Sequence, residues 1–273
     1  MDQRLWGIDC FRGCAVLLMV LYHVLYDLDL FEIFTFKLYS PAWKLYAQIV
    51  AGTFFFLVGI GLHLSYQKAT RRLTFPQRLR KYVLRGAKII FLGVSISLAT
   101  FYFFPQNYII FGALHFIGFS VLLGYLIMEI HPGQTYGRPF AAIALSLIFA
   151  GFLLRDIRVE FSWLLWLGVR PSGFTTLDYF PILPWFGVIL AGITFSSRNH
   201  HYQSNTMIST SEPPWIAKPL CAIGRHSLII YLLHQPLLLG SLHLFWLSEA
   251  TQDNPLTCYA PVVYICRPKA FCL

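Results

Sequence analysis

Residues 4–31 read RLWGIDCFRGCAVLLMVLYHVLYDLDLF, and this stretch decides the fold. It is apolar enough to cross a membrane as a helix, yet it contains four ionisable side chains: Asp9, Arg12, His23 and Asp27. At about 100° per residue, all four fall on the same side of such a helix. A charge that faces lipid is energetically costly, so this side is expected to face protein or water. We therefore expect a functional site along it.

The composition indicates a membrane protein with several spans. Hydrophobic residues make up 57% of the 273 residues, charged residues only 12%, and the mean hydropathy is +0.60. Soluble domains carry roughly 25% charged residues, which excludes that class here. The net charge of +9 does not indicate nucleic-acid binding, because the basic residues are gathered between apolar runs, as in cytoplasmic loops. We predict an all-α, polytopic transmembrane helix bundle.

About seven apolar runs approach or reach the length that a membrane-spanning helix needs. In chain order they are 8–31, 43–66, a run that ends at Phe104, 108–130, 140–154, 181–195 and 220–247. Between the fifth and sixth, residues 155–180 are mixed, and their apolar part at 161–169 is too short to cross, so we expect an interfacial or re-entrant segment. The chain is thus predicted to form one transmembrane domain over 1–247, followed by a tail at 248–273 without clear structure.

The orientation follows from the basic residues. Residues 67–88 contain eight Lys and Arg and no acidic residue. The positive-inside rule makes this loop, and with it the N-terminus, cytoplasmic, and about two thirds of all Lys and Arg then fall inside. No small-residue cleavage site follows the first apolar run, so we expect an uncleaved anchor. Cys10 and Cys14 are expected to be small apolar packing residues, since the six cysteines show no metal-ligand spacing.

Four polar side chains fall in the outer half of the predicted bundle. His23 and His115 each lie about 10 Å from the outer end of their span, and Asp27 lies one helical turn beyond His23. Asp178 opens the sixth span from the same side. A histidine one turn from a carboxylate can act as a general base whose ring the carboxylate orients. We predict His23 as base or acyl acceptor with Asp27 orienting it. His115 and Asp178 would bind the acceptor or stabilise an oxyanion.

A second, basic layer lies near the inner edge. It contains Arg12, Arg85 and Arg225, with Asp9 beside Arg12. Guanidinium groups bind phosphates in a bidentate way, and coenzyme A carries such phosphates. We predict that these arginines bind an acyl-CoA. Acyl transfer from a cytoplasmic thioester to an acceptor on the far side would use both layers.

Other polar residues admit two interpretations. His63 on the second span, and Tyr231 and His234 on the seventh, would either bind substrate or hydrogen-bond a neighbouring helix. Asp178 could simply cap a loop, and Arg12 could be an anchor whose head reaches the membrane surface. We predict no metal site.

Four motifs carry a resemblance to a known family. They are D-x-x-RG-x-AVLLMV-x-YH-x-x-x-DL (Asp9–Leu28), GALHFIG (Gly112–Gly118), DYFPILPWFG (Asp178–Gly187) and IGRHSLIIYLLHQPLL (Ile223–Leu238). In this order they resemble the family built around the heparan-α-glucosaminide N-acetyltransferase catalytic domain. The RG…H opening and the late R-H-S…H run are also similar to the wider group of membrane acyltransferases that acylate glycans. The resemblance ends at about residue 247.

The resemblance implies transfer of an acetyl or acyl group from acetyl-CoA or another acyl-CoA to a sugar amine or hydroxyl. The acceptor would be a cell-envelope glycan or a small amino sugar. In the wider group the histidine after RG is catalytic, and this position is His23 here. The bacterial members of the family lie in the inner membrane, which implies the same multi-pass location.

Two other functions use the same residues. A small-molecule or proton-coupled transporter would employ the ionisable stripe of the first span as a proton relay. A membrane haem protein would employ His23 and His115 as axial ligands at equal depth. The expected partners are the lipid bilayer, an acyl-CoA and a glycan acceptor, not nucleic acid. Homo-oligomerisation stays open.

Overall fold

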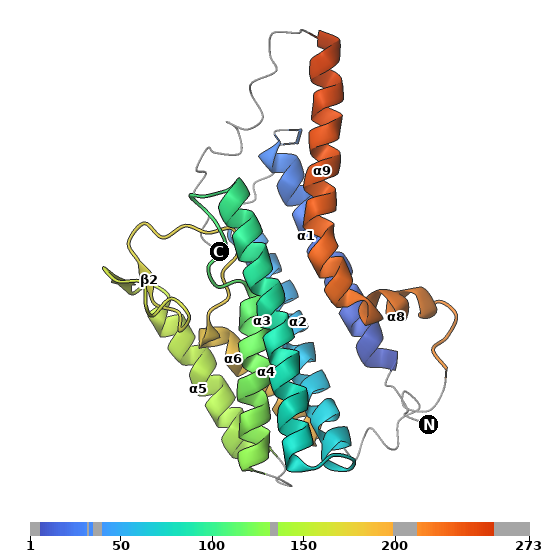
Figure 1. Cartoon of the computed structure of the whole chain (residues 1–273), viewed down its shortest axis with the longest axis vertical. Coiled ribbons are helices and arrows are strands. Elements are labelled where there is room, and N and C mark those ends of the chain that lie inside the picture. The colour runs from blue at the N-terminus through green and yellow to red at the C-terminus, as the bar shows by residue number, and fades with distance from the viewer. Residues whose placement is uncertain (1–5, 32, 35–39, 132–135, 199–211, 254–273) are drawn as a thin grey trace. The chain divides into compact units, whose positions relative to one another are not determined.

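The structure, a computed structural model, describes residues 6–31, 33–34, 40–131, 136–198 and 212–253 (Figure 1). Its helices are α1 (Trp6–Leu30), α2 (Pro41–Thr70), α3 (Phe75–Phe103), α4 (Ala113–Ile130), α5 (Arg138–Leu154), α6 (Ile182–Arg198), α8 (Lys218–Arg225) and α9 (Ser227–Asp253). The predicted helical class is confirmed for this part of the chain.

Five of these helices are long and apolar enough to cross a membrane: α1, α2, α3, α4 and α9. Helices α5 and α6 are apolar but have only 17 residues each. The prediction of a membrane protein built from apolar helices therefore holds. The count of seven spans and the cytoplasmic N-terminus stay predictions.

The seventh predicted span is divided in the structure. Helix α8 ends at Arg225, His226 interrupts the helical backbone, and α9 begins at Ser227. Helix α9 then continues to Asp253, so the boundary predicted at 247 lies inside a helix. The rest of the predicted tail, residues 254–273, lies outside the described residues.

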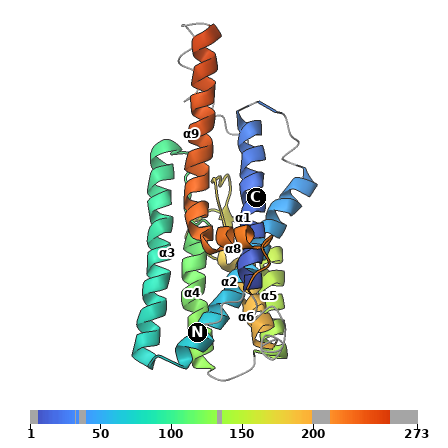
Figure 2. The same cartoon turned by 90° about the vertical axis from the view of Figure 1, so that its right-hand side faces the viewer.

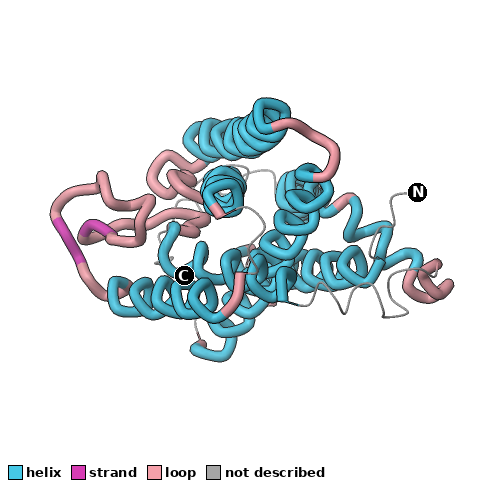
Figure 3. Tube along the Cα trace, turned by 90° about the horizontal axis from the view of Figure 1, so that it is seen from below, coloured by secondary structure: helices cyan, strands magenta, loops and turns pink. Residues whose placement is uncertain are grey.

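The segment between α5 and α6 is not helical. Two short strands, β1 (Arg158–Val159) and β2 (Arg170–Pro171), pair in parallel, and turns connect them (Figure 3). Trp163 and Trp166 in these turns are exposed. Exposed tryptophans are typical of membrane interfaces, so the prediction of an interfacial segment remains reasonable.

The chain forms two compact units, which we describe separately. The first contains α1, α2 up to Phe54, α8 and α9. The second contains α2 from Phe55 onward, α3 to α6, and the two strands.

In the first unit, α1 packs against α8 and runs beside α9 (Figures 1 and 2). The α1–α8 contact is close because glycines face backbone: Gly13 lies against the carbonyl of Leu220, and Gly224 lies against that of Asp9. A Cβ atom at either position would overlap these groups, so larger residues would separate the two helices. The Cys10 and Cys221 sulfurs also meet here, 2.8 Å apart, whereas Cys14 is exposed.

In the second unit, α3 packs along α4, α5 packs along α6, and α4 also contacts α6. The interior is apolar and aromatic: Phe55 of α2 meets the edges of the Phe116 and Trp185 rings, with centroids 4.7 and 5.4 Å away. Helix α4 contributes most to this interior, since 61% of its residues are buried. It therefore carries His115 and Glu129 into protein surroundings rather than into lipid.

Candidate functional site

Two histidines meet in the first unit. His23 of α1 and His234 of α9 have ring centroids 4.7 Å apart at an angle of 74°. Beside them, the side-chain amide of Gln235 donates to both carboxylate oxygens of Asp27, at 3.0 and 3.2 Å. We call His23, Asp27, His234 and Gln235 the α1–α9 cluster. It joins two helices that are far apart in the sequence.

The hydrogen bonds of the two rings fix where their protons lie. Nδ1 of His23 is 2.9 Å from the carbonyl of Met19, and Nδ1 of His234 is 2.8 Å from that of Tyr231. A carbonyl only accepts, so each neutral ring holds its proton on Nδ1 and leaves a lone pair on Nε2. Nε2 of His234 is buried and has no hydrogen-bond partner among the described residues. Within the described residues, the cluster thus leaves Nε2 of His234 without a hydrogen-bond partner.

In the structure, His23 has a hydrogen-bond partner other than the predicted Asp27. Side chains of a helix lean toward its N-terminus, so the ring of His23 reaches back to Met19, away from Asp27 on the next turn. Asp27 is instead held by Gln235 and is fully buried, with 0% exposure. A buried carboxylate needs hydrogen-bond donors, and Gln235 supplies them. The sequence analysis missed Gln235, although it directly follows His234.

An aromatic wall adjoins His23 in the same unit. The ring of Tyr22 meets that of His23 edge-on, with centroids 5.4 Å apart, and stacks on Trp43 at 5.3 Å. Tyr46 stacks on both Tyr22 and Trp43, and its hydroxyl donates to the Leu18 carbonyl at 2.9 Å. The start of α2 thereby places flat aromatic surfaces against Tyr22, whose ring meets that of His23. The Trp43 Nε1 is buried without a hydrogen-bond partner in the described chain.

The predicted donor-binding arginines are divided between the units. Arg12 is half-buried beside Asp9, with 3.9 Å between Nη1 and Oδ1, and Asp9 itself is buried. Gly224 of α8 packs on the backbone of Asp9 in α1. The exposed Arg225 directly follows Gly224 and ends α8. Arg12 and Arg225 therefore come from helices in direct contact. Arg85 lies on the exposed side of α3 in the second unit.

His115 and Asp178 come together at the start of α4 in the second unit. Asp178 Oδ2 accepts a hydrogen bond from the backbone N–H of Ala113 at 2.9 Å, which is a favourable contact for a carboxylate at a helix N-terminus. His115 follows two residues later, buried, with its ring stacked on Phe111. Its Nδ1 has no hydrogen-bond partner among the residues described. Asp178 thus accepts a hydrogen bond at the N-terminus of α4, which is a capping contact of the kind that the sequence analysis allowed.

His63 makes the helix–helix contacts that the structural interpretation expects. Gln67 donates to Nε2 at 3.2 Å, so Nδ1 donates to the hydroxyl of Ser196 on α6 at 2.9 Å. The ring is 2% exposed, and Tyr136 meets it edge-on at 5.9 Å. Burial, with a smaller contribution from Glu129, raises the pKa of Tyr136 to about 12, so its hydroxyl stays protonated. Both ring nitrogens of His63 are therefore used within the protein.

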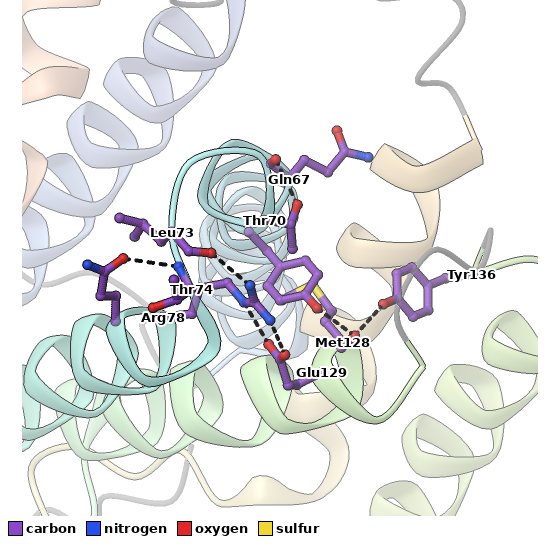
Figure 4. Close-up of polar contacts among 10 residues, drawn as sticks. Gln67, Thr70, Leu73, Thr74, Arg78, Met128, Glu129 and Tyr136 are labelled. Carbon is purple, nitrogen blue, oxygen red and sulfur yellow. Dashed lines mark hydrogen bonds and ion pairs between the residues drawn. The ribbon is translucent and has the colours of Figure 1, made fainter.

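A second polar cluster, which the sequence analysis did not predict, joins α2, α3 and α4 (Figure 4). Arg78 Nε and Nη2 both donate to the carboxylate of Glu129, and Nη1 donates to the Leu73 carbonyl at 2.9 Å. The hydroxyls of Tyr66 and Tyr136 both donate to the carbonyl of Met128. The signal was present: Glu129 is an acidic residue inside an apolar helix, and such residues usually have a partner.

The comparison with known families identifies the chain. The family described as heparan-alpha-glucosaminide N-acetyltransferase, catalytic, matches residues 4–236. The match includes the α1–α9 cluster and all the predicted site residues. No curated protein and no solved structure matches the chain. The resemblance carried by the four motifs is confirmed, and this integral membrane protein belongs to the family of the heparan-alpha-glucosaminide N-acetyltransferase catalytic domain.

Proposed function

We propose that this protein transfers an acetyl or acyl group from an acyl-CoA to a sugar amine or hydroxyl. The family supports a membrane acetyltransferase. One observation carries the choice of reacting group: the rings of His23 and His234 meet while each Nδ1 is engaged by a backbone carbonyl, which leaves Nε2 as the basic atom. His23 Nε2 acts as the base or as the acyl acceptor.

As a base, His23 Nε2 takes the proton of the acceptor hydroxyl or amine while that group attacks the thioester carbonyl. The bond from carbonyl to sulfur breaks, and the leaving thiolate takes a proton from the imidazolium. As an acyl acceptor, Nε2 attacks the carbonyl itself, the carbonyl–sulfur bond breaks, and CoA leaves as a thiolate beside an acyl-imidazolium. The sugar hydroxyl or amine then attacks the acyl carbon, the bond from that carbon to Nε2 breaks, and the sugar proton passes to the thiolate. In both routes Nδ1 keeps its hydrogen bond to Met19, so the ring stays oriented.

The other members of the α1–α9 cluster support this chemistry. His234 offers a second nitrogen that can exchange a proton with the leaving thiolate or the acceptor. Asp27 and Gln235 act as positioning residues, because their hydrogen bonds hold α1 against α9 beside the two rings. Tyr231 contributes the carbonyl that fixes the tautomer of His234.

Arg12 and Arg225 suit the phosphates of the donor, since they come from contacting helices and bind phosphate bidentately. The aromatic wall of Tyr22, Trp43 and Tyr46 suits the acceptor, because sugar rings stack their C–H faces on aromatic surfaces. The acceptor would be a cell-envelope glycan or small amino sugar, and the location a bacterial inner membrane. Roles for His115 and Asp178 in binding the acceptor or an oxyanion remain part of the proposal.

The test is release of free CoA thiol from acetyl-CoA by the purified full chain, with amino sugars as acceptors. His23→Ala should lower the rate at least about 100-fold, as expected on losing a general base or nucleophile. His243→Ala, on the same helix as His234 but outside the cluster, is the matched control and should keep its rate.

Both variants must show the same thermal transition in detergent as the unaltered protein. Full turnover by folded His23→Ala would overturn the assignment. A transporter that uses the same stripe as a relay would instead move solute into vesicles that contain no acyl-CoA.

A further inference from the structure

Three basic residues form an exposed stripe along the first half of α3. Lys81, Arg85 and Lys88 follow the spacing i, i+4, i+7 and so lie within about 60° of one another around the helix. All three are exposed. Within the described chain none forms an ion pair, whereas Arg78, one turn earlier, is bound to Glu129. Nζ of Lys81 lies over the ring of Tyr82, 5.3 Å from its centroid.

The packing of α3 on α4 turns this stripe outward. Gly86 lies against Leu122 and Gly118 of α4, and Gly93 lies against His115. These glycines are roughly a third of a turn around the helix from the basic stripe. A Cβ atom would lie 2.8 Å from the Leu122 side chain at Gly86 and 3.1 Å from His115 at Gly93, so this side of α3 packs closely on α4 and the basic stripe does not.

Apolar residues continue the same outer side of α3. Leu84, Phe91 and Leu98 recur every seven residues next to the stripe and are 47%, 70% and 66% exposed. Such a surface on a membrane helix fits acyl chains. The exposed side of α3 is therefore amphiphilic: cationic at its start and apolar beyond.

The length of the apolar part places the charges close to the hydrocarbon. Residues 89–103 follow Lys88 and extend about 22 Å at 1.5 Å per residue. Hydrocarbon is about 30 Å thick, so Arg85 and Lys88 lie near its edge. Long basic side chains at that depth reach toward headgroups, and an anionic phosphate there neutralises them.

We propose that Lys81, Arg85 and Lys88 bind the phosphate of an anionic phospholipid, whose acyl chains lie along the apolar residues of the same face. The apolar continuation favours a phospholipid over a water-soluble phosphate ligand. This site is separate from the proposed acyl-transfer site, and it gives Arg85 a lipid ligand in place of the predicted acyl-CoA.

The test compares lipid binding by two double variants of the purified full chain. Lys81→Gln/Lys88→Gln removes two charges from the stripe. Lys68→Gln/Arg71→Gln removes two exposed charges from the same basic loop but at the end of α2. Each protein is titrated in detergent with phosphatidylglycerol and, separately, with phosphatidylcholine, and bound lipid is counted by native mass spectrometry.

The unaltered protein should retain phosphatidylglycerol in preference to phosphatidylcholine. Each basic residue near an anionic lipid strengthens binding about five-fold, and the stripe variant lacks two of them. It should therefore bind phosphatidylglycerol about 25-fold more weakly. The α2 variant should bind as the unaltered protein does. Lys81→Arg/Lys88→Arg keeps both charges and should restore binding, which separates loss of charge from loss of structure.

Equal weakening in both double variants would overturn the proposal, because it would mean diffuse attraction without a site. So would equal retention of the two lipids, or displacement of phosphatidylglycerol by acetyl-CoA. Thiol release from acetyl-CoA is measured on the same samples. Its presence without lipid selectivity would reject the lipid site alone, and its absence with lipid selectivity would reject the acyl-transfer function alone.

Discussion

Both units contain buried polar side chains among apolar helices, and these side chains differ in how their nitrogens are bonded. In the second unit, both nitrogens of His63 and the guanidinium of Arg78 are bound by other parts of the protein. In the first unit, Nδ1 of both His23 and His234 donates to a backbone carbonyl, and Nε2 carries the lone pair. The comparison teaches that a membrane-helix histidine is best judged by what its second nitrogen contacts, not by its presence.

The largest effect on stability should come from the ion pair of the second unit. Glu129→Gln leaves Arg78 without its carboxylate in surroundings where the two side chains are only 16% and 14% exposed. Removing one partner of a mostly buried pair costs about 3 kcal/mol, measured as the free energy of unfolding in a detergent titration.

The matched control is the exposed pair Lys218–Glu212, which is 57% and 88% exposed and has a 3.5 Å separation. Glu212→Gln should change the unfolding free energy by less than about 0.5 kcal/mol. If Glu129→Gln and Glu212→Gln had the same free energy of unfolding, the Arg78–Glu129 pair would not stabilise the second unit. The contrast with the α1–α9 cluster would then fail.

A smaller effect, in the same direction, is expected at His63. His63→Ala removes hydrogen bonds to Ser196 and Gln67 and should destabilise the protein by about 2 kcal/mol. Ser196→Ala removes only one of these bonds and should cost about 1 kcal/mol. Thiol release per folded molecule should be unchanged in both. Loss of turnover in a folded His63→Ala protein would contradict this prediction. It would mean that a histidine with both nitrogens hydrogen-bonded matters for activity as much as His23 does.

Much of the fold could be predicted because hydropathy along a chain reports which residues lie in lipid or in a protein interior. The first span was predicted as 8–31 and is α1, and the fourth was predicted as 108–130 and ends with α4 at Ile130. A one-residue break such as that at His226 changes hydropathy very little, so α8 and α9 were predicted as one span. The β1–β2 pair is likewise too short to give a strand pattern.

The arrangement of side chains in the α1–α9 cluster could be predicted only in part. Helical spacing alone put His23 and Asp27 on one side of α1, because that requires only the geometry of one helix. Spacing does not say which helix comes alongside, so the pairing of His23 with His234 and of Asp27 with Gln235 could not be foreseen. Nor does a side-chain pattern show backbone carbonyls, and Met19 orients His23 through one. The meeting of His23 with His115 and Asp178 in one layer stays a prediction.

The finest test of the comparison concerns Gln235. Gln235→Ala removes both hydrogen bonds to the fully buried carboxylate of Asp27 and so loosens α9 beside the two rings. If positioning of the rings matters, the turnover number for thiol release should fall about ten-fold with little change in the KM for acetyl-CoA, because the interaction acts on the transition state. Gln48→Ala, at an exposed glutamine of α2, is the control and should have no effect. Unchanged turnover in a folded Gln235→Ala protein would mean that the carboxylate–amide contact only joins α1 to α9, as the His63–Ser196 contact joins α2 to α6. A ten-fold loss would show that the first unit uses its polar contacts to aim a reacting group.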